Sequence, residues 1–193
     1  MKTQKLAFHF AFALACFLLP AVPHAQDQKT QTPAEFRAQL RKEAPETIAA
    51  FRKADPTIER FFKESAGYAV FPRIGKAGFI IGGGHGAGEV YEKGKLIGTA
   101  NTTLVTVGLQ AGAQEFSEII FFENQAAVDR FKQSNFEFAA SASAVIITAG
   151  AAKSAKYNNG VAVFAHPRGG AMAEAALGTQ KFSFKAEGET AKK

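Results

Sequence analysis

The chain of 193 residues contains a single cysteine, no tryptophan and few histidines. Cys16 lies in an apolar segment near the N-terminus, so the rest of the chain has no disulfide, no thiolate metal ligand and no cysteine nucleophile. After residue 25 only His85 and His166 remain, and no cluster of carboxylates accompanies them in the sequence. These absences argue against a thiolate or histidine-rich metal site, and we expect no metal and no other cofactor.

The first 25 residues have the three parts of a secretory signal peptide. Two lysines precede an apolar run over residues 6–19, which is too short for a membrane-spanning helix and is followed by a polar chain. We expect cleavage after Ala25, with Ala21 as the alternative, and therefore a periplasmic or secreted protein. A lipid anchor on Cys16 is another alternative, although it would be attached halfway along the apolar segment.

The 168 residues after this signal are enough for one domain with a hydrophobic core. They hold 21 basic and 17 acidic residues, and the net charge of +4 suits an anionic membrane surface as well as an ordinary soluble protein. We expect a polar linker over residues 26–31, one domain over residues 32–185 and a polar tail over residues 186–193.

Residues 33–66 predict three short amphipathic helices. The sequence Thr32-Pro33-Ala34-Glu35 has the pattern of a capping box with proline at the first helical position. Pro45 and the pair Asp55-Pro56 each predict a further helix start. Apolar side chains recur at helical spacing along this segment: Phe36, Leu40, Ile48, Phe51, Ile58, Phe61 and Phe62.

From Tyr68 the apolar residues alternate with period two, which is typical of strands. We expect a strand that ends at Pro72, a hairpin of strands over residues 79–91 and 95–108 with its turn at residues 92–95, and a helix that begins after Asn124. Further strand patterns cover residues 109–123, 136–152, 159–166 and 169–185. Helices followed by hairpin-connected strands predict an α+β fold, in which the helices pack on a strongly curved, Gly/Ala-rich antiparallel sheet, barrel-like or sandwich, with one inserted helix.

Five of the seven residues from Gly82 to Gly88 are glycine. A dinucleotide-binding loop would need a helix after these glycines, whereas a strand and a turn follow them. As a strand, the segment has glycine at four successive positions of one face, namely residues 82, 84, 86 and 88. A bare face of this kind predicts a bend, close approach of another backbone, or a ligand against the strand, and we favour curvature over a ligand.

Three stretches resemble the SYLF domain, a lipid-binding module of secreted bacterial proteins and of eukaryotic membrane-trafficking and actin-patch proteins. They are "VFPRIGKAGFIIGGGHGAGEVY", "GLQAGAQEFSEIIFF" with the helix "NQAAVDRFKQS", and "GGAMAEAALGTQKF". The family commonly has glycine directly after "KAGF", where this chain has Ile80. The resemblance implies binding of anionic phospholipid, aided by an amphipathic helix at the start of the domain, and no catalytic activity.

Basic residues flank the apolar side chains of the expected helices, as they do in helices that lie at a membrane interface. The alternative is that these helices bury their apolar face on the sheet, with Lys and Arg stems along the seam. Together with the resemblance, this pattern gives the candidate lipid-binding residues: Arg37, Arg41, Arg52, Lys53, Arg60, Lys63, Lys76, Gly78 and Phe79.

We therefore expect non-catalytic binding of anionic phospholipid in the cell envelope, through these cations and either an apolar helix face or a glycine-walled groove. The alternative is an envelope structural or interaction protein that binds another protein, and we expect no nucleic-acid partner. Glu115 and Glu118 are three residues apart in a predicted strand, so they point to opposite faces and cannot pair as acid and base. Arg168 lies in a predicted turn, either as a phosphate contact or as a solvated side chain.

Overall fold

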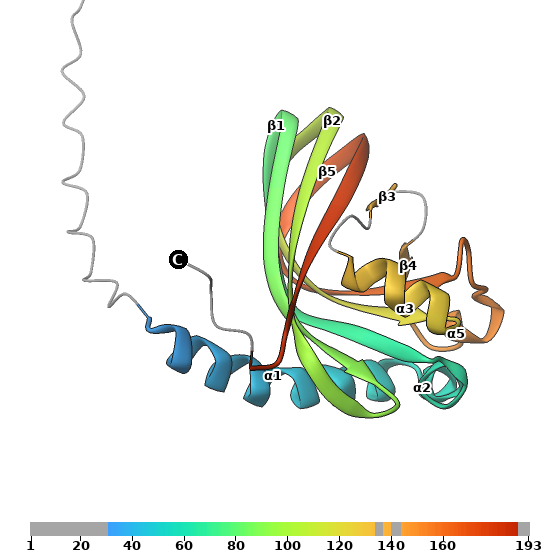
Figure 1. The fold of residues 1–193 in the computed structure, drawn as a ribbon. Coiled ribbons are helices and arrows are strands. Elements are labelled where there is room, and N and C mark those ends of the chain that lie inside the picture. Colours follow the sequence, from blue (N-terminus) through green and yellow to red (C-terminus); the bar gives the residue numbers. More distant parts are fainter. Residues whose placement is uncertain (1–30, 134–136, 140–143, 189–193) are drawn as a thin grey trace, which may run out of the picture. The chain divides into compact units, whose positions relative to one another are not determined.

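The computed structural model describes residues 31–133, 137–139 and 144–188, with the backbone alone for residues 137–139 and 171–177. The expected signal peptide lies outside the described residues, and those from Thr32 onward form one compact unit. Its elements, labelled in Figure 1, are α1 (Pro33–Ala54), η1 (Pro56–Ile58), α2 (Glu59–Glu64), β1 (Gly67–Glu92), β2 (Lys95–Phe122), α3 (Gln125–Lys132), β3 (Glu137–Ala139), β4 (Ala144–Ile146), α5 (Ala151–Ser154) and β5 (Val161–Ala186).

The α+β class is confirmed, and the strands form one sheet in the order β1-β2-β5-β3. These neighbours are antiparallel, whereas β4 pairs with β5 in parallel, so the sheet is mixed rather than wholly antiparallel. A parallel pair needs a crossover connection, which the chain from residue 147 to residue 160 supplies with α5. Among the described strands β1 does not pair with β3, so the sheet stays open.

Three strands are much longer than the sequence patterns predict. β1, β2 and β5 contain 26, 28 and 26 residues, and a straight strand of that length would extend over roughly 85 Å. The expected strand end at Pro72 is wrong, because the β1–β2 register merely shifts between Phe71 and Ile74 and pairing resumes. At Gly108 and Gly112 of β2 the φ angles are 145° and 126°, so glycine bends this strand where the pattern predicted an end.

The glycine-rich half of β1 lies directly against the first half of the same strand. A Cβ atom at Gly88 would lie 2.3 Å from the carbonyl oxygen of Val70, and one at Gly86 would lie 2.7 Å from that of Arg73. The strand reverses around Ile80, a non-glycine residue with a φ of +68°. The bare glycine face is therefore confirmed, and its cause is close approach of another backbone combined with a bend.

Folding of the sheet on itself creates an inner core, which α3 closes with Ala127, Val128 and Phe131. The sheet contributes these buried residues to it: Ala69, Phe71, Ile74, Val90, Ala100, Leu104, Ile120, Phe122, Val161, Val163 and Phe182. A second core lies between the outer face of the sheet and the helical segments. Its buried members are Ala44, Phe51, Ile58, Phe61, Val70, Ile119, Phe121, Ile147, Ala152, Ala162 and Phe164.

Pro45 lies inside α1, so the prediction of a helix break at this residue is wrong. Proline in a helix interior removes one hydrogen bond and costs about 3 kcal/mol. The proline ring is exposed, while α1 buries one continuous face on both sides of it, through Leu40, Ala44, Thr47 and Phe51. Burial of this face keeps the two halves of α1 in one helix.

The predicted local signals are confirmed elsewhere. Thr32 and Glu35 form the capping box, in which the Glu35 N–H donates to Thr32 Oγ1 (3.2 Å) and the Thr32 N–H donates to Glu35 Oε2 (2.8 Å). Lys93 and Gly94 form the hairpin turn with φ angles of 50° and 75°. The Asn124 side chain caps α3. Residues whose role is set by their immediate neighbours are therefore predicted well.

Asp55 ends α1 and joins the helical segment to the chain around α5. Its Oδ1 accepts from the N–H (2.9 Å) and the hydroxyl (2.7 Å) of Thr57, and its Oδ2 accepts from the Ala152 N–H at 2.7 Å. Burial acts to raise the pKa of Asp55, but the hydrogen bonds outweigh it and hold the pKa below its usual value.

The close approach within β1 predicts that Gly88→Ala destabilises the fold by about 1–3 kcal/mol, because the added methyl group meets Val70 and Phe71. Gly83→Ala is the matched control on the same strand, since its nearest neighbour would be the Leu104 carbonyl oxygen at 4.0 Å. Urea unfolding should show a loss in the first variant and a change within about 0.5 kcal/mol in the second. Equal effects of the two substitutions would contradict the close approach.

Candidate functional site

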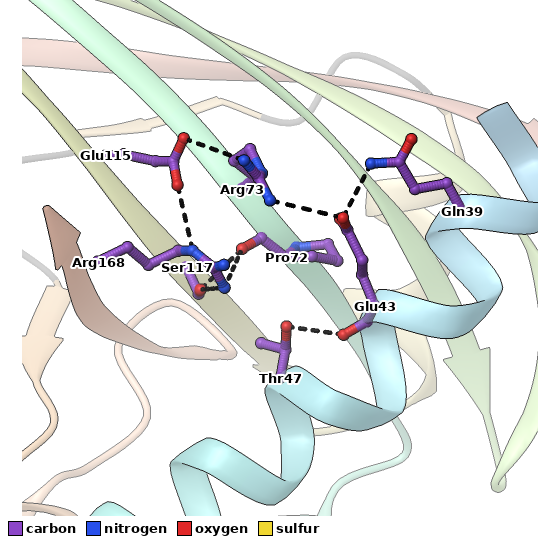
Figure 2. Close-up of polar contacts among 8 residues, drawn as sticks. All are labelled: Gln39, Glu43, Thr47, Pro72, Arg73, Glu115, Ser117 and Arg168. Atoms are coloured by element: carbon purple, nitrogen blue, oxygen red, sulfur yellow. Dashed lines mark hydrogen bonds and ion pairs between the residues drawn. The ribbon is translucent and has the colours of Figure 1, made fainter. Parts of the chain in front are cut away.

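Two arginines and two glutamates from four elements meet on the outer face of the sheet (Figure 2). Arg73 of β1 lies between Glu43 of α1 and Glu115 of β2, with N–O distances of 3.5 and 3.7 Å. Arg168 of β5 approaches the other oxygen of Glu115 at 3.2 Å. The carboxylate of Glu115 is thus held between two guanidinium groups, and we call Arg73, Glu115 and Arg168 the arginine cluster.

The register shift at Pro72 explains why this cluster forms here. The Pro72 carbonyl oxygen leaves the strand ladder and accepts hydrogen bonds from Ser117 Oγ (2.7 Å) and Arg168 Nη1 (3.4 Å). A carbonyl removed from its ladder needs other donors, and Arg168 supplies one of them. Arg168 therefore lies within β5 and not in the predicted turn, and its guanidinium is positioned by both β1 and β2.

An open groove of about 490 Å3 adjoins the arginine cluster. Its walls are mainly glycine and alanine, and the residues that line it are Gly75, Lys76, Ala77, Gly83, Ala113, Gln114, Glu115, Gly169 and Gly170. Gly75 pairs with Glu115 and Ala77 pairs with Ala113. The small residues Gly75, Ala77 and Ala113 therefore lie on the same face of the sheet as Glu115. Small residues at these positions leave room beside the charged groups.

The candidate residues of β1 lie at the bend of the sheet. Lys76 is buried, with 7% of its surface exposed, whereas Phe79 is 75% exposed. Gly78 belongs to the bend itself, because a Cβ atom there would lie 2.4 Å from the Cα atom of Gly82. The structure therefore brings Lys76 to the groove, keeps Phe79 in solvent and gives Gly78 a role in chain reversal.

The candidate cations of the helices lie along α1 and α2, away from the bend (Figure 1). Arg41 pairs with Glu187, and Arg52 pairs with Glu59 at 2.8 Å. Arg37, Lys53 and Lys63 are exposed.

Arg60 differs from these cations because its guanidinium is used inside the fold. Its Nη2 donates to the carbonyl oxygens of Ala152 (3.0 Å) and Ala155, and the guanidinium lies 4.4 Å from the centre of the Phe61 ring. It thereby ties α2 to the chain around α5.

The outer apolar surface at the bend is a feature that the sequence analysis missed. Ile81, Val105, Val107 and Leu109 are exposed beside Phe79. A signal was available, because β2 has no charged residue between Lys95 and Glu115. The arginine cluster, by contrast, joins residues far apart in the chain, and only the strand register places them together.

A second carboxylate of β2 points into the folded sheet. Glu118 is buried and its Oε1 accepts a hydrogen bond of 2.8 Å from Gln180 Nε2, which also donates to Thr102 Oγ1 at 3.0 Å. Burial raises the pKa of Glu118 from 4.5 to about 8, and the hydrogen bond from Gln180 opposes this rise. Glu115 and Glu118 therefore lie on opposite faces, as the sequence predicted.

The raised pKa of Glu118 predicts a pH-dependent stability. The protonated form is favoured in the folded protein, so its contribution is fully present below pH 4.5 and is lost as the pH rises through about 8. Over this window the wild-type protein should lose up to about 1 kcal/mol per pH unit relative to Glu118→Gln. Denaturant unfolding at several pH values measures the difference, and identical pH profiles for the two proteins would contradict a neutral buried Glu118.

Among the described residues, no three His, Cys, Asp or Glu side chains lie close enough to hold a metal ion. His85 is exposed, and His166 packs on Phe51 with 5.7 Å between ring centres. Within the described ranges, no helix is long and apolar enough to cross a membrane.

These observations define an α+β domain with a folded sheet, the arginine cluster beside an open groove, and an apolar surface at the bend. Residues 103–188, from within β2 to just beyond the end of β5, match the family model Ysc84, described as "Las17-binding protein actin regulator". This is the SYLF family, so the resemblance is confirmed over these residues. No curated protein matches the chain.

Proposed function

We propose that the protein binds anionic phospholipid at a membrane surface of the cell envelope and catalyses no reaction. The observation that carries this proposal is the position of the Glu115 carboxylate between Arg73 and Arg168. Two guanidinium groups that converge on one carboxylate also fit a phosphate group, which accepts the same N–H donors. A phospholipid headgroup at this position would replace Glu115 as their anionic partner.

The groove beside the arginine cluster supports a lipid rather than a free phosphate. Its walls of glycine and alanine offer an open, weakly polar surface next to the charged groups. Both arginines are partly exposed, with 52% and 38% of their side chains accessible, so a headgroup reaches them without unfolding the sheet. The lipid would place its phosphate at Arg73 and Arg168 and its glycerol in the groove.

The positive net charge of the chain after residue 25 would attract an anionic surface before contact. Each cation near such a surface contributes about 1 kcal/mol. The exposed cations of the helices, Arg37, Lys53 and Lys63, would add to this attraction without inserting. The apolar face of α1 is buried on the sheet, so we assign the helix an electrostatic role only.

Location and absence of catalysis are parts of the same proposal. The expected signal peptide supports a place in the periplasm or outside the cell. Because Glu115 and Glu118 lie on opposite faces of the sheet, they cannot serve as acid and base on one substrate.

A second candidate function is the binding of another protein. The description of the matching family, "Las17-binding protein actin regulator", favours this class for members of the family. For this chain the partner would be a protein of the envelope.

Vesicle sedimentation tests the lipid proposal with the processed chain, residues 26–193, because the uncleaved apolar segment would itself bind membranes. We expect binding that rises with the anionic lipid content and weakens when salt is raised from about 0.05 to about 0.5 M. Arg73→Gln/Arg168→Gln should weaken binding at least about tenfold, since two cations are lost. Lys53→Gln/Lys63→Gln on the helices removes the same number of positive charges, so it is the control for charge and should have a smaller effect.

Both variants must keep the wild-type circular dichroism spectrum and melting temperature. Arg60 is left unchanged, because it holds the carbonyl oxygens of Ala152 and Ala155. Absence of binding at every lipid composition would refute the proposal and favour a protein partner. Equal weakening in the two variants would contradict the headgroup site while leaving lipid binding in place.

A further inference from the structure

We infer that the bends of β1 and β2 form an apolar tip that inserts into the membrane to which the protein binds. The inference rests on the proposed lipid function and names the part of the surface that enters the bilayer. The tip consists of six large apolar side chains: Phe79, Ile80, Ile81, Val105, Val107 and Leu109.

The six side chains of the tip are between 53% and 76% exposed. Ile81 pairs with Val107 across the β1–β2 ladder, and Gly83 pairs with Val105. Cross-strand partners share a face, and alternate residues of a strand do so as well, which places Val105, Val107 and Leu109 on one side. Grouped exposed apolar side chains of this kind mark a contact with another protein or with a membrane.

The polarity of β2 is inverted at the tip. Thr106 and Gln110 are buried, with 1% and 4% of their surface exposed, while Val105, Val107 and Leu109 between and beside them face solvent. Lower on the same strand the usual order holds, because Asn101 and Thr103 are exposed and their neighbours are buried. A strand in contact with water normally has polar residues outside, so the tip matches an apolar environment instead.

Hydrogen bonds fix this inverted arrangement. Thr106 Oγ1 donates to Gln110 Oε1 at 2.7 Å, and Gln110 Nε2 donates to the carbonyl oxygens of Ile80 (3.1 Å) and Thr106 (3.2 Å). A shift of the strand by one residue would exchange its two faces, and it would break these bonds. The apolar residues therefore point outward in a specified register.

Ile80 adds a second indication. It adopts a φ of +68°, a conformation that is strained for a β-branched residue and that glycine would take without cost. Its side chain is 53% exposed, so core packing does not account for isoleucine here. Insertion into hydrocarbon would give this side chain a contact that compensates the strain.

Charge distinguishes a membrane from a protein partner. Residues 77–84 of β1 and 96–114 of β2 contain no charged residue, and the bend in β5 has one, Glu174, whose side chain lies outside the described part of the structure. The arginine cluster lies next along the strands, and Arg73 precedes Phe79 by six residues, at most about 20 Å along β1. With the tip immersed by about 5–10 Å, the two arginines would lie near the anionic headgroups.

The absence of tryptophan from the chain allows a direct test, since Leu109→Trp introduces the only one. With anionic vesicles, we expect its fluorescence to shift to the blue and to be quenched by lipids brominated on their acyl chains. Thr103→Trp is the matched control, because Thr103 is exposed on the same face of β2 below the tip and should show neither effect. Sedimentation of the same samples reports binding separately.

The outcomes separate this inference from the proposed function. The Leu109→Trp variant could sediment with vesicles while its indole fluorescence stays unshifted and unquenched. That result would overturn insertion and leave lipid binding intact. Failure to sediment with any vesicle would overturn both. Equal shifts for the Leu109→Trp and Thr103→Trp variants would place the whole face on the membrane and contradict insertion of the tip alone.

A second variant tests whether the tip supplies binding strength. Phe79→Ser/Leu109→Ser should weaken vesicle binding by at least about a hundredfold, because two large side chains no longer leave water. Both residues are exposed, so the melting temperature should be unchanged. The tip could instead contact a second copy of the chain, and light scattering without vesicles tests this alternative. A wild-type dimer that becomes monomeric in this variant would show that the tip joins two copies of the chain. That result would overturn insertion.

Discussion

The contact between the two halves of β1 determines the path of the whole sheet. Glycine at residues 84, 86 and 88 lets the second half of the strand lie on the carbonyl groups of the first half. β2 pairs with β1, and β5 pairs with β2, along nearly their whole length, so both strands follow the path of β1. One sheet thereby encloses its own core, and its bends become the end of the molecule farthest from α1 (Figure 1).

This folding divides the surface into regions with different chemistry. The outer face near the base is covered by α1, η1 and α2, which therefore stabilise the fold through a buried apolar side. Farther along the strands, small residues leave a groove beside Arg73, Glu115 and Arg168. At the bends the outward side chains are apolar, while the buried Gln110 side chain donates a hydrogen bond to the Ile80 carbonyl oxygen. The order from cations to apolar tip corresponds to the order from headgroup to hydrocarbon in a membrane leaflet.

The sequence predicts the features that depend on neighbouring residues. The capping box at Thr32, the cap at Asn124 and the two-residue turn at Lys93 and Gly94 follow from local backbone chemistry. The bare glycine face was also predictable, because alternation assigns residues to the faces of a strand.

Strand ends were predicted at Pro72 and near Gly108, although both residues lie inside long strands. Proline and glycine weaken a ladder locally, and whether the strand continues depends on pairing with residues far along the chain. The arginine cluster escaped prediction for the same reason.

Hydrogen–deuterium exchange with and without anionic vesicles distinguishes insertion of the tip from membrane contact through α1, because it reports on both in one experiment. Among the described strands β1 is an edge strand, so its amides that point away from β2 lie outside the ladder. If the tip inserts, we expect slower exchange in peptides that cover residues 77–83 and 104–111 when vesicles are present, with α1 unchanged. Slower exchange confined to Pro33–Ala54 in vesicle-bound protein would contradict it and assign membrane contact to the helix.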